Sequence, residues 1–351
     1  MSVKKELFGQ TREGKDVYTY TITNKNNMSI CVMDFGAILK NVWVPDKKGK
    51  VDDVVLGYDK LWMYFANGSF FGATVGPVCN RTNEGKFVID KKTYSLPIND
   101  RKKNNLHSDF YEGFHKRLWK ATEGDNCVTF KLKKKDKEMG HPGNLDVSVT
   151  YTLTDDNEIK IQYHADTDKK TVINMTNHSY FNLSGVKSDN IEKTKLCINA
   201  SNFTPVRADS IPTGEIESVI GSVFDFTKGK AIGKDINKFE NKQLKFGKGY
   251  DHNFCVDGWN NDGKLILVAT ATDEKSGRIL ETYSDLPGVQ FYAGNCIGEN
   301  TGKEGYRNVK RKGFCLETQY YPNSAAEEKF PQPIFDKDNS YDTTTVYKFK
   351  W

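Results

Sequence analysis

Apolar and polar residues alternate along most of this chain. The clearest examples are residues 17–22, 147–153 and 158–163, where every second side chain is apolar or aromatic. A period of two is typical of a strand with one buried face and one solvated face. Clusters of turn-forming residues at 45–49 and 155–157 lie between such segments. The pattern therefore predicts many antiparallel strands joined by hairpins.

Helical periodicity is nearly absent. The best candidate for a helix is one short, aromatic-rich segment at residues 59–66. No linker rich in Pro, Gly and Ser, no shift in composition and no internal repeat divides the chain. These features predict an all-β fold with one large domain over residues 1–351, built as a sandwich of twisted antiparallel sheets with functional groups on a concave face.

No segment has the features of a membrane span or a secretory signal. The longest apolar run is the six residues Leu61–Ala66, whereas a membrane-spanning helix needs about 20. The first ten residues contain lysines but no apolar stretch behind them. The seven cysteines are odd in number, lie far apart and include no CxxC pair, which indicates reduced thiols. We therefore expect a cytoplasmic protein with no membrane partner.

Charge is spread over the chain. The 51 basic and 46 acidic residues give a net charge of +5. The densest basic segment, residues 131–137, is typical of an exposed hairpin. This balance excludes the basic surface that nucleic-acid binding requires, so we expect no nucleic-acid partner.

Sequence signatures of common cofactors and metals are also absent. The chain has no GxGxxG motif, and residues 229–234 have neither the spacing of a phosphate-binding loop nor its Ser or Thr. It has no HExxH motif, and its six histidines are scattered. No GxSxG motif marks a serine nucleophile. We therefore predict neither a cofactor nor a metal site.

Short polar segments interrupt several apolar or aromatic stretches. Each could have a purely structural role, such as an ion pair at Arg81 or a hydrogen-bonded core histidine at His178. Together they suggest carbohydrate binding, because carboxylate, amide and guanidinium groups bind hydroxyls while aromatic rings stack on a sugar's apolar face. The segments are residues 79–83, 105–107, 174–182, 249–254, 287–292 and 315–319.

Six ordered motifs make the chain recognisable. They are TNHSYFNLSG (176–185), GYDHNF (249–254), LPGVQFYAGN (286–295), CLETQ (315–319), FPQPI (330–334) and TTTVYKF (343–349). With these motifs the chain resembles the aldose 1-epimerase (galactose mutarotase) family along essentially its whole length. The resemblance implies a β-sandwich with the sugar site in an open central cleft. It also implies cofactor-free interconversion of the α and β anomers of a small-molecule partner, a free aldohexose such as galactose or glucose.

The resemblance assigns roles to individual residues. Glu317 matches the general base of the family and His178 its general acid. Opening a pyranose hemiacetal requires removal of the proton from the anomeric hydroxyl and protonation of the ring oxygen, so a carboxylate and an imidazolium suffice. The residues that match those binding the sugar hydroxyls are Asn80, Arg81, His107, Asp251 and Gln290.

Three motifs depart from the family pattern. Where relatives read G-R-x-x-N-R, Pro77 replaces the first arginine. Where they read L-H-G-G, this chain has Ser108 and Asp109, and His115 replaces the aspartate of G-F-D-K. The acid and the base are intact, so these departures bear on substrate preference more than on the reaction. Asp109 either alters the site or points to solvent.

Other functions stay open at this point. A non-catalytic carbohydrate-binding β-sandwich would explain the aromatic and polar groups without an acid and a base. A glycosidase could use Asp251 and Glu317 as its pair of carboxylates. Within the family, a phosphosugar epimerase is a further alternative, although no arginine cluster lies beside the motifs. The motifs specify neither the preferred hexose nor the oligomeric state.

Overall fold

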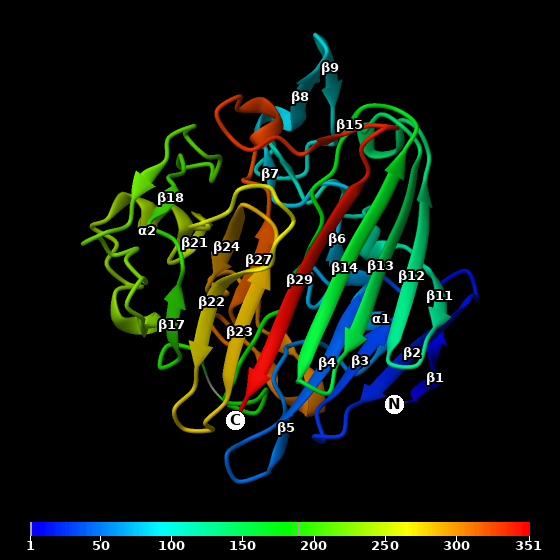
Figure 1. The fold of residues 1–351 in the computed structure, drawn as a ribbon, viewed down its shortest axis with the longest axis vertical. Coiled ribbons are helices and arrows are strands. Elements are labelled where there is room, and N and C mark those ends of the chain that lie inside the picture. Colours follow the sequence, from blue (N-terminus) through cyan, green and yellow to red (C-terminus); the bar gives the residue numbers. More distant parts are fainter. Residues whose placement is uncertain (1, 189) are drawn as a thin grey trace.

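The fold is dominated by one large antiparallel sheet, seen face-on in Figure 1. It is described here from a computed structural model that covers residues 2–188 and 190–351. The C-terminal strand lies in the middle of this sheet, so strands from both halves of the chain flank it. The nine strands, in order across the sheet, are β11 (Lys120–Glu123), β12 (Cys127–Lys134), β13 (Leu145–Leu153), β14 (Glu158–Thr167), β29 (Tyr341–Lys350), β23 (Ile279–Ser284), β22 (Ile266–Thr272), β17 (Lys195–Ile198) and β20 (Lys230–Ala231).

The three strands predicted from alternating residues are confirmed. Residues 17–22 lie in β2 (Asp16–Thr23), residues 147–153 in β13 and residues 158–163 in β14. In β13 the side chains at positions 145, 147, 149, 151 and 153 are buried, and those between them are at least partly exposed. One face of the strand therefore packs into the core, as the period of two requires.

Two five-stranded sheets complete the main layers. One of them, called the third sheet here, contains β27 (Cys315–Gln319) and packs behind the large sheet, where the Tyr347 hydroxyl of β29 donates a hydrogen bond to the carbonyl of Leu316 in β27. This packing of antiparallel sheets confirms the all-β sandwich. The second sheet consists of β1 (Val3–Gln10), β2 (Asp16–Thr23), β3 (Ser29–Met33), β4 (Ile38–Pro45) and β5 (Val51–Asp53), and the third of β19 (Glu217–Ser218), β18 (Asn202–Thr204), β21 (Asp251–Cys255), β24 (Gly288–Tyr292) and β27 (Cys315–Gln319).

Five two-stranded ribbons tie loops to these sheets. Two of them, β6 with β16 and β7 with β10, pair segments that are not adjacent in the sequence, and β16 contacts β27 at the edge of the third sheet. The ribbons are β6 (Thr74–Val75) with β16 (Thr176–Asn177), β7 (Arg81–Thr82) with β10 (Asn105–Leu106), β8 (Lys86–Ile89) with β9 (Lys92–Ser95), β15 (Thr171–Val172) with β28 (Ile334–Phe335), and β25 (Asn300–Thr301) with β26 (Arg307–Asn308).

Helices are few and short. The helix expected at residues 59–66 is present as α1 (Leu61–Ala66). A second, unpredicted helix, α2 (Lys242–Gly247), begins where the Asn241 side chain accepts hydrogen bonds from the backbone N–H groups of Gln243 and Leu244. No helix in the described part of the chain is long and apolar enough to cross a membrane. Single 3₁₀ turns occur at Asn83–Gly85, Phe114–Lys116, Glu138–Gly140, Ile232–Lys234, Lys303–Gly305 and Ser324–Ala326.

Candidate active site

All seven predicted site residues line one cleft. The cleft has a volume of about 180 Å³ and lies where the third sheet meets the β7–β10 and β6–β16 ribbons. Segments more than 200 residues apart in sequence therefore supply its walls. Those seven residues are Asn80, Arg81, His107, His178, Asp251, Gln290 and Glu317, and the other lining residues include Phe70, Tyr180, Tyr292 and Cys296.

Strand register places the three residues from the third sheet. Gln290 in β24 lies directly opposite Glu317 in β27. On the other side of β24, Asp251 begins β21, and the side-chain amide of Gln290 donates a hydrogen bond to Asp251 Oδ1 at 2.7 Å. The sheet therefore presents two carboxylates with an amide between them. The amide holds the Asp251 carboxylate in one orientation.

Glu317 and His178 form the closest pair of titratable groups in the cleft. His178 Nε2 lies 3.6 Å from Glu317 Oε2, and the two residues are only 5% and 2% exposed. Glu317 Oε2 accepts no hydrogen bond from the described residues, so it is free to accept one from a ligand. On the other side of the imidazole, Nδ1 lies 3.5 Å from the thiol sulfur of Cys315.

Burial shifts the pKa values of this pair in opposite directions. It raises the pKa of Glu317 well above its usual range, and the nearby Asp251 carboxylate adds to this effect. It lowers the pKa of His178 to about 4. Burial therefore favours the neutral carboxyl and the neutral imidazole over the ion pair, because charged groups are disfavoured away from water.

Arg81 and His107 contribute donors to the opposite wall. The Nε of Arg81 donates to Asp100 Oδ2 at 3.0 Å, and a terminal guanidinium nitrogen lies 4.0 Å from Asp251 Oδ2. His107 Nδ1 accepts a hydrogen bond from the backbone N–H of Asn80 at 3.1 Å. The neutral His107 ring therefore carries its proton on Nε2 and can donate it to a hydroxyl oxygen.

A glutamine behind the cleft links its walls. Gln319 donates from its amide nitrogen to Asn253 Oδ1 at 3.1 Å and to Gln290 Oε1 at 3.3 Å. Its amide oxygen accepts a hydrogen bond from Asn80 Nδ2 at 3.4 Å. Gln319 therefore joins the third sheet to Asn80, the residue directly before β7, where Arg81 lies.

The residues that depart from the family pattern do not line this cleft. Ser108 has a left-handed backbone (φ +63°), a conformation that glycine, the residue expected there from the family pattern, adopts without strain. Its hydroxyl donates to the carbonyl of Val78 and accepts from the Val78 N–H, both at 2.9 Å. The carboxylate of Asp109 caps a turn by accepting from the N–H groups of residues 111 and 112. Pro77 and His115 are also outside the lining of the cleft.

Several site residues were missed by sequence reasoning. Asp100 orients Arg81, but it lies directly before a turn and carries no distinguishing pattern. Phe70 reaches the cleft from the loop after α1, outside every motif. Tyr180 and Tyr292 did lie inside recognised motifs, where their aromatic rings between polar residues were the available signal.

Three of the seven predicted site residues lie close enough together to surround a metal ion. His107, His178 and Glu317 each offer one ligand atom, and these atoms lie within 4.8 Å of one another. Such a ligand set can bind zinc. His107 is poorly suited to this role, because its Nδ1 lone pair already accepts the Asn80 N–H and its Nε2 carries the proton. The arrangement is better suited to proton transfer and hydroxyl binding.

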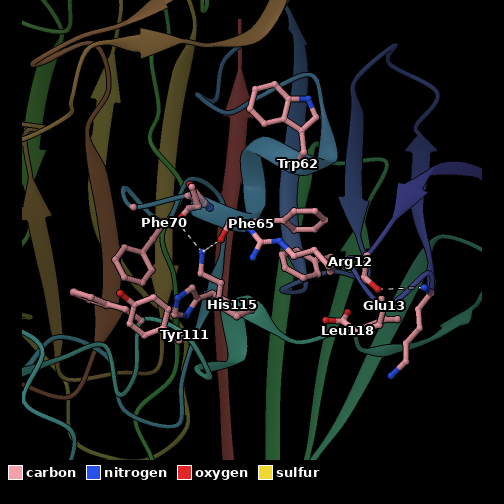
Figure 2. Close-up of a pocket in the computed structure, with 16 residues that line it drawn as sticks. Arg12, Glu13, Trp62, Phe65, Phe70, Tyr111, His115 and Leu118 are labelled. Carbon is pink, nitrogen blue, oxygen red and sulfur yellow. Dashed lines mark hydrogen bonds between the residues drawn. The ribbon is translucent and has the colours of Figure 1, made fainter.

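A larger groove lies beside the cleft (Figure 2). It has a volume of about 830 Å³ and shares Gly68 and Phe70 with the cleft. Trp62, Phe65 and Tyr111 contribute aromatic side chains to it (Figure 2). None of the seven predicted site residues lines this groove, so its size does not make it the reaction site.

Comparison with known proteins identifies the family. The family model described as Aldose 1-epimerase matches residues 18–348. The chain is 39% identical over 350 residues to the galactose mutarotase of Bos taurus, with 99% of each chain covered. It is 35% identical over 342 residues to the aldose 1-epimerase of Escherichia coli (strain K12), with 96% of each covered.

Solved structures agree with this result. The structure of an aldose epimerase homologue from C. elegans superposes with a TM-score of 0.85 at 29% identity, covering 94% of this chain and 98% of that one. Matches of this extent define an enzyme of the carbohydrate epimerase class. The chain belongs to the aldose 1-epimerase family.

Proposed function

We propose that this aldose 1-epimerase interconverts the α and β anomers of free aldohexoses, galactose and glucose among them, with Glu317 as general base and His178 as general acid. The observation that carries the proposal is the buried pair itself, with a carboxylate oxygen and an imidazole nitrogen 3.6 Å apart. The anomeric hydroxyl oxygen and the ring oxygen of a pyranose are attached to the same carbon. Two groups this close can reach both oxygens at once.

The reaction needs two proton transfers in each direction. Glu317 removes the proton of the anomeric hydroxyl while His178 protonates the ring oxygen, and the bond between that oxygen and the anomeric carbon breaks. The open-chain aldehyde rotates about the bond to its carbonyl carbon. Ring closure on the other face then returns both protons, with His178 acting as base and Glu317 as acid. Each positioned proton transfer contributes a rate factor of about 10² to 10⁴.

The remaining polar residues suit the recognition of hydroxyl groups. Arg81, His107 and Asn80 offer donors, Asp251 offers acceptors, and Gln290 bonds to Asp251 while facing the cleft. Arg81 has a second effect, because its positive charge lowers the pKa of Glu317 and so opposes part of the effect of burial. Asp251 similarly raises the pKa of His178. Arg81 thus favours the ionised form of Glu317 and Asp251 the protonated form of His178, while the Asp251 charge also raises the pKa of Glu317.

Two lesser points extend the proposal. We infer one domain over residues 1–351, because a single buried apolar cluster includes residues from Tyr20 to Phe349. We also infer a reducing, cytoplasmic location, since all seven cysteines are free and four of them are buried.

Polarimetry tests the function directly. Fresh α-galactose and α-glucose should lose their excess optical rotation faster with enzyme than without it. Glu317→Gln keeps the shape of the base and should lower the catalysed rate about 10²- to 10⁴-fold. Activity should survive exhaustive chelation with EDTA, because the proposed steps use only side-chain proton transfer. Equal rates for Glu317→Gln and wild type would refute the assigned base, and restoration by zinc of activity lost to EDTA would refute the cofactor-free reaction.

A binding protein or a glycosidase would give a different result. A non-catalytic sugar-binding sandwich would leave the spontaneous rate of rotation unchanged. A glycosidase would release reducing sugar from a glycoside, which the proposed chemistry does not do because it requires a free anomeric hydroxyl. Running a methyl glycoside beside the free hexose separates these outcomes in one experiment.

A further inference from the structure

Two aromatic rings flank the imidazole of His178. The ring of Phe70 lies 5.7 Å from it at an interplanar angle of 18°, and the ring of Tyr180 lies 5.0 Å from it at 21°. Both contacts are near-parallel and offset, which is a favourable stacking geometry. The two rings come from separate segments, the loop after α1 and the segment after β16.

The backbone holds Phe70 in a conformation that large side chains rarely adopt. Its φ is +58°, in the left-handed region. The loop keeps this shape because the Asn67 side chain accepts from the Phe71 N–H at 2.9 Å and donates to the Phe71 carbonyl. A strained residue held by its surroundings at a site is a recognised sign of function.

The same loop is bonded to the backbone of His178. The N–H of Gly72 donates to the carbonyl of His178 at 3.0 Å. A side chain at position 72 would meet the carbonyl oxygen of Leu39 at 2.1 Å, so only glycine fits there. Phe70 and His178 are therefore fixed relative to each other through main-chain as well as ring contacts.

We propose that Phe70 and Tyr180 are positioning residues that hold the His178 imidazole toward Glu317 and favour its protonated form during ring opening. The face of an aromatic ring carries partial negative charge and attracts a cation more than a neutral ring. Two such faces beside His178 oppose the effect of burial, which disfavours the imidazolium. The inference rests on the proposed role of His178 as the acid.

Other groups near His178 also influence its protonation. Asp251 favours the imidazolium through its negative charge, and Glu317 does so once it is ionised. A positive charge on His107, whose ring centre lies 5.4 Å away, would oppose it. The ring centre of His115 lies 4.6 Å from that of Phe70. The titratable and charged groups that face His178 or the stacked rings are Glu317, Cys315, Asp251, Tyr292, His107, His115 and Arg81. The test therefore changes only the stacked rings and leaves this set intact.

Leucine and tyrosine substitutions separate ring stacking from simple packing. Phe70→Leu removes the π face but keeps an apolar side chain, whereas Phe70→Tyr keeps the ring. We expect Phe70→Leu to lower kcat about 5- to 30-fold with little change in KM, because losing a desolvated cation–π contact changes an equilibrium by about this factor. Phe70→Tyr should stay within about 3-fold of wild type. Tyr180→Leu and Tyr180→Phe form the matched second pair.

A readout independent of rate is the titration of His178 itself. In ¹⁵N-labelled enzyme, with His178→Asn used to assign the signal, the pKa of His178 should fall by about 0.7 to 1.5 units in Phe70→Leu, the same 5- to 30-fold change, and stay unchanged in Phe70→Tyr. An unchanged His178 titration in a folded Phe70→Leu enzyme would overturn the inference. So would a rise in KM at constant kcat, which would show that Phe70 contacts the sugar instead.

A double-mutant comparison completes the test. If Phe70 acts through His178, Phe70→Leu should cost little further activity in a His178→Asn background. A full additional loss there would assign Phe70 a role unrelated to the acid. Failure of the proposed function is distinguishable from failure of this inference, because it would appear as wild-type enzyme that does not accelerate mutarotation at all.

Discussion

The proton shared by Glu317 and His178 determines how the rate should depend on pH. Burial raises the pKa of Glu317 and lowers that of His178 to about 4, so the order of the two values is reversed from that of the free side chains. Over the interval between the two values the pair holds one proton in total. Moving that proton from Glu317 to His178 produces the reactive ion pair without any exchange with solvent. The acid and alkaline limbs of a pH–rate profile therefore report the two pKa values of the coupled pair.

We predict a bell-shaped pH profile of kcat/KM in which protonation of His178 causes the acid limb and deprotonation of Glu317 causes the alkaline limb. As the pH falls toward 4, His178 takes up a second proton while Glu317 keeps the first, and activity is lost. As the pH rises through the raised pKa of Glu317, the pair loses its only proton, and activity is lost again. NMR titration of the unliganded enzyme checks this assignment. A His178 signal that titrates near 6.5 would instead assign the alkaline limb to His178.

His141 illustrates a buried residue that costs stability. It is fully buried against Phe87, and neither of its ring nitrogens has a hydrogen-bond partner among the described residues. Burial, with a smaller contribution from the Lys134 charge, lowers its pKa to about 3. Between this value and the ordinary 6.5 the unfolded chain binds a proton that the folded chain does not. Stability is therefore lost as the pH falls below about 6.5.

Replacing this histidine should stabilise the protein, most clearly in acid. We expect His141→Phe to raise the free energy of unfolding by about 1 kcal/mol at pH 7, since it removes unpaired polar atoms, and by roughly 2 kcal/mol more at pH 5. Urea unfolding at both pH values measures the difference. His164→Gln is the control, because Asp342 and Asp166 raise the pKa of His164 despite its partial burial, so that variant should lose stability in acid. A gain for His141→Phe that does not grow at pH 5 would contradict the prediction.

At the scale of elements, the sequence predicted long strands well and short ribbons poorly. The alternation in β2, β13 and β14 is a local signal, because each strand carries its own period of two. The pairing of β7 with β10 and of β6 with β16 involves two residues a side, too few to show any period. Those ribbons nevertheless place Arg81, His107 and His178. From the sequence, only the resemblance to a family predicted that these three residues lie in one site.

The same limit applies to residues that support the site. Asp100 bonds to Arg81, and Phe70 stacks on His178, through contacts made by loops whose paths depend on tertiary packing. The short helix α2 also escaped prediction, because six residues carry too little periodicity to distinguish from a loop. Strand type followed from local pattern, whereas the geometry of the cleft depends on long-range contacts.

The altered loop beside His107 allows a test at this scale. Ser108 bonds to the backbone of Val78 and Asp109 caps a turn, so both stabilise the loop without lining the cleft. We expect reversion of Ser108 and Asp109 to Gly-Gly to leave the ratio of galactose to glucose kcat/KM within about 2-fold. It should lower Tm by a few degrees, because the loss of four hydrogen bonds is partly offset by placing glycine in the left-handed backbone at position 108. Polarimetry with both sugars and a thermal melt measure these effects. A change of tenfold or more in the ratio would show that this loop selects the substrate.

At the scale of the whole molecule, the last strand connects the two halves of the chain. β29 lies between β14 and β23 and pairs with eight residues of the first and six of the second. Its buried residues Tyr341, Tyr347 and Phe349 belong to the main apolar cluster. The hydroxyl of Tyr341 accepts from the N–H of Met175, three residues before His178, at 3.1 Å. The C-terminal strand therefore supports both the large sheet and the segment that carries the proposed acid.

A protein organised this way should unfold as one unit. We predict a single endotherm in calorimetry and coincident loss of fluorescence and circular dichroism signals, as expected for one cooperative domain. Ending the chain at Ser340 removes β29 and exposes the paired edges of β14 and β23 together with the apolar residues beneath them. This truncation should abolish the native transition and yield aggregated protein, because two unpaired interior strands become edges. Two resolved transitions in the full chain, or a folded and active truncated form, would show instead that the halves are stable separately and that β29 only borders them.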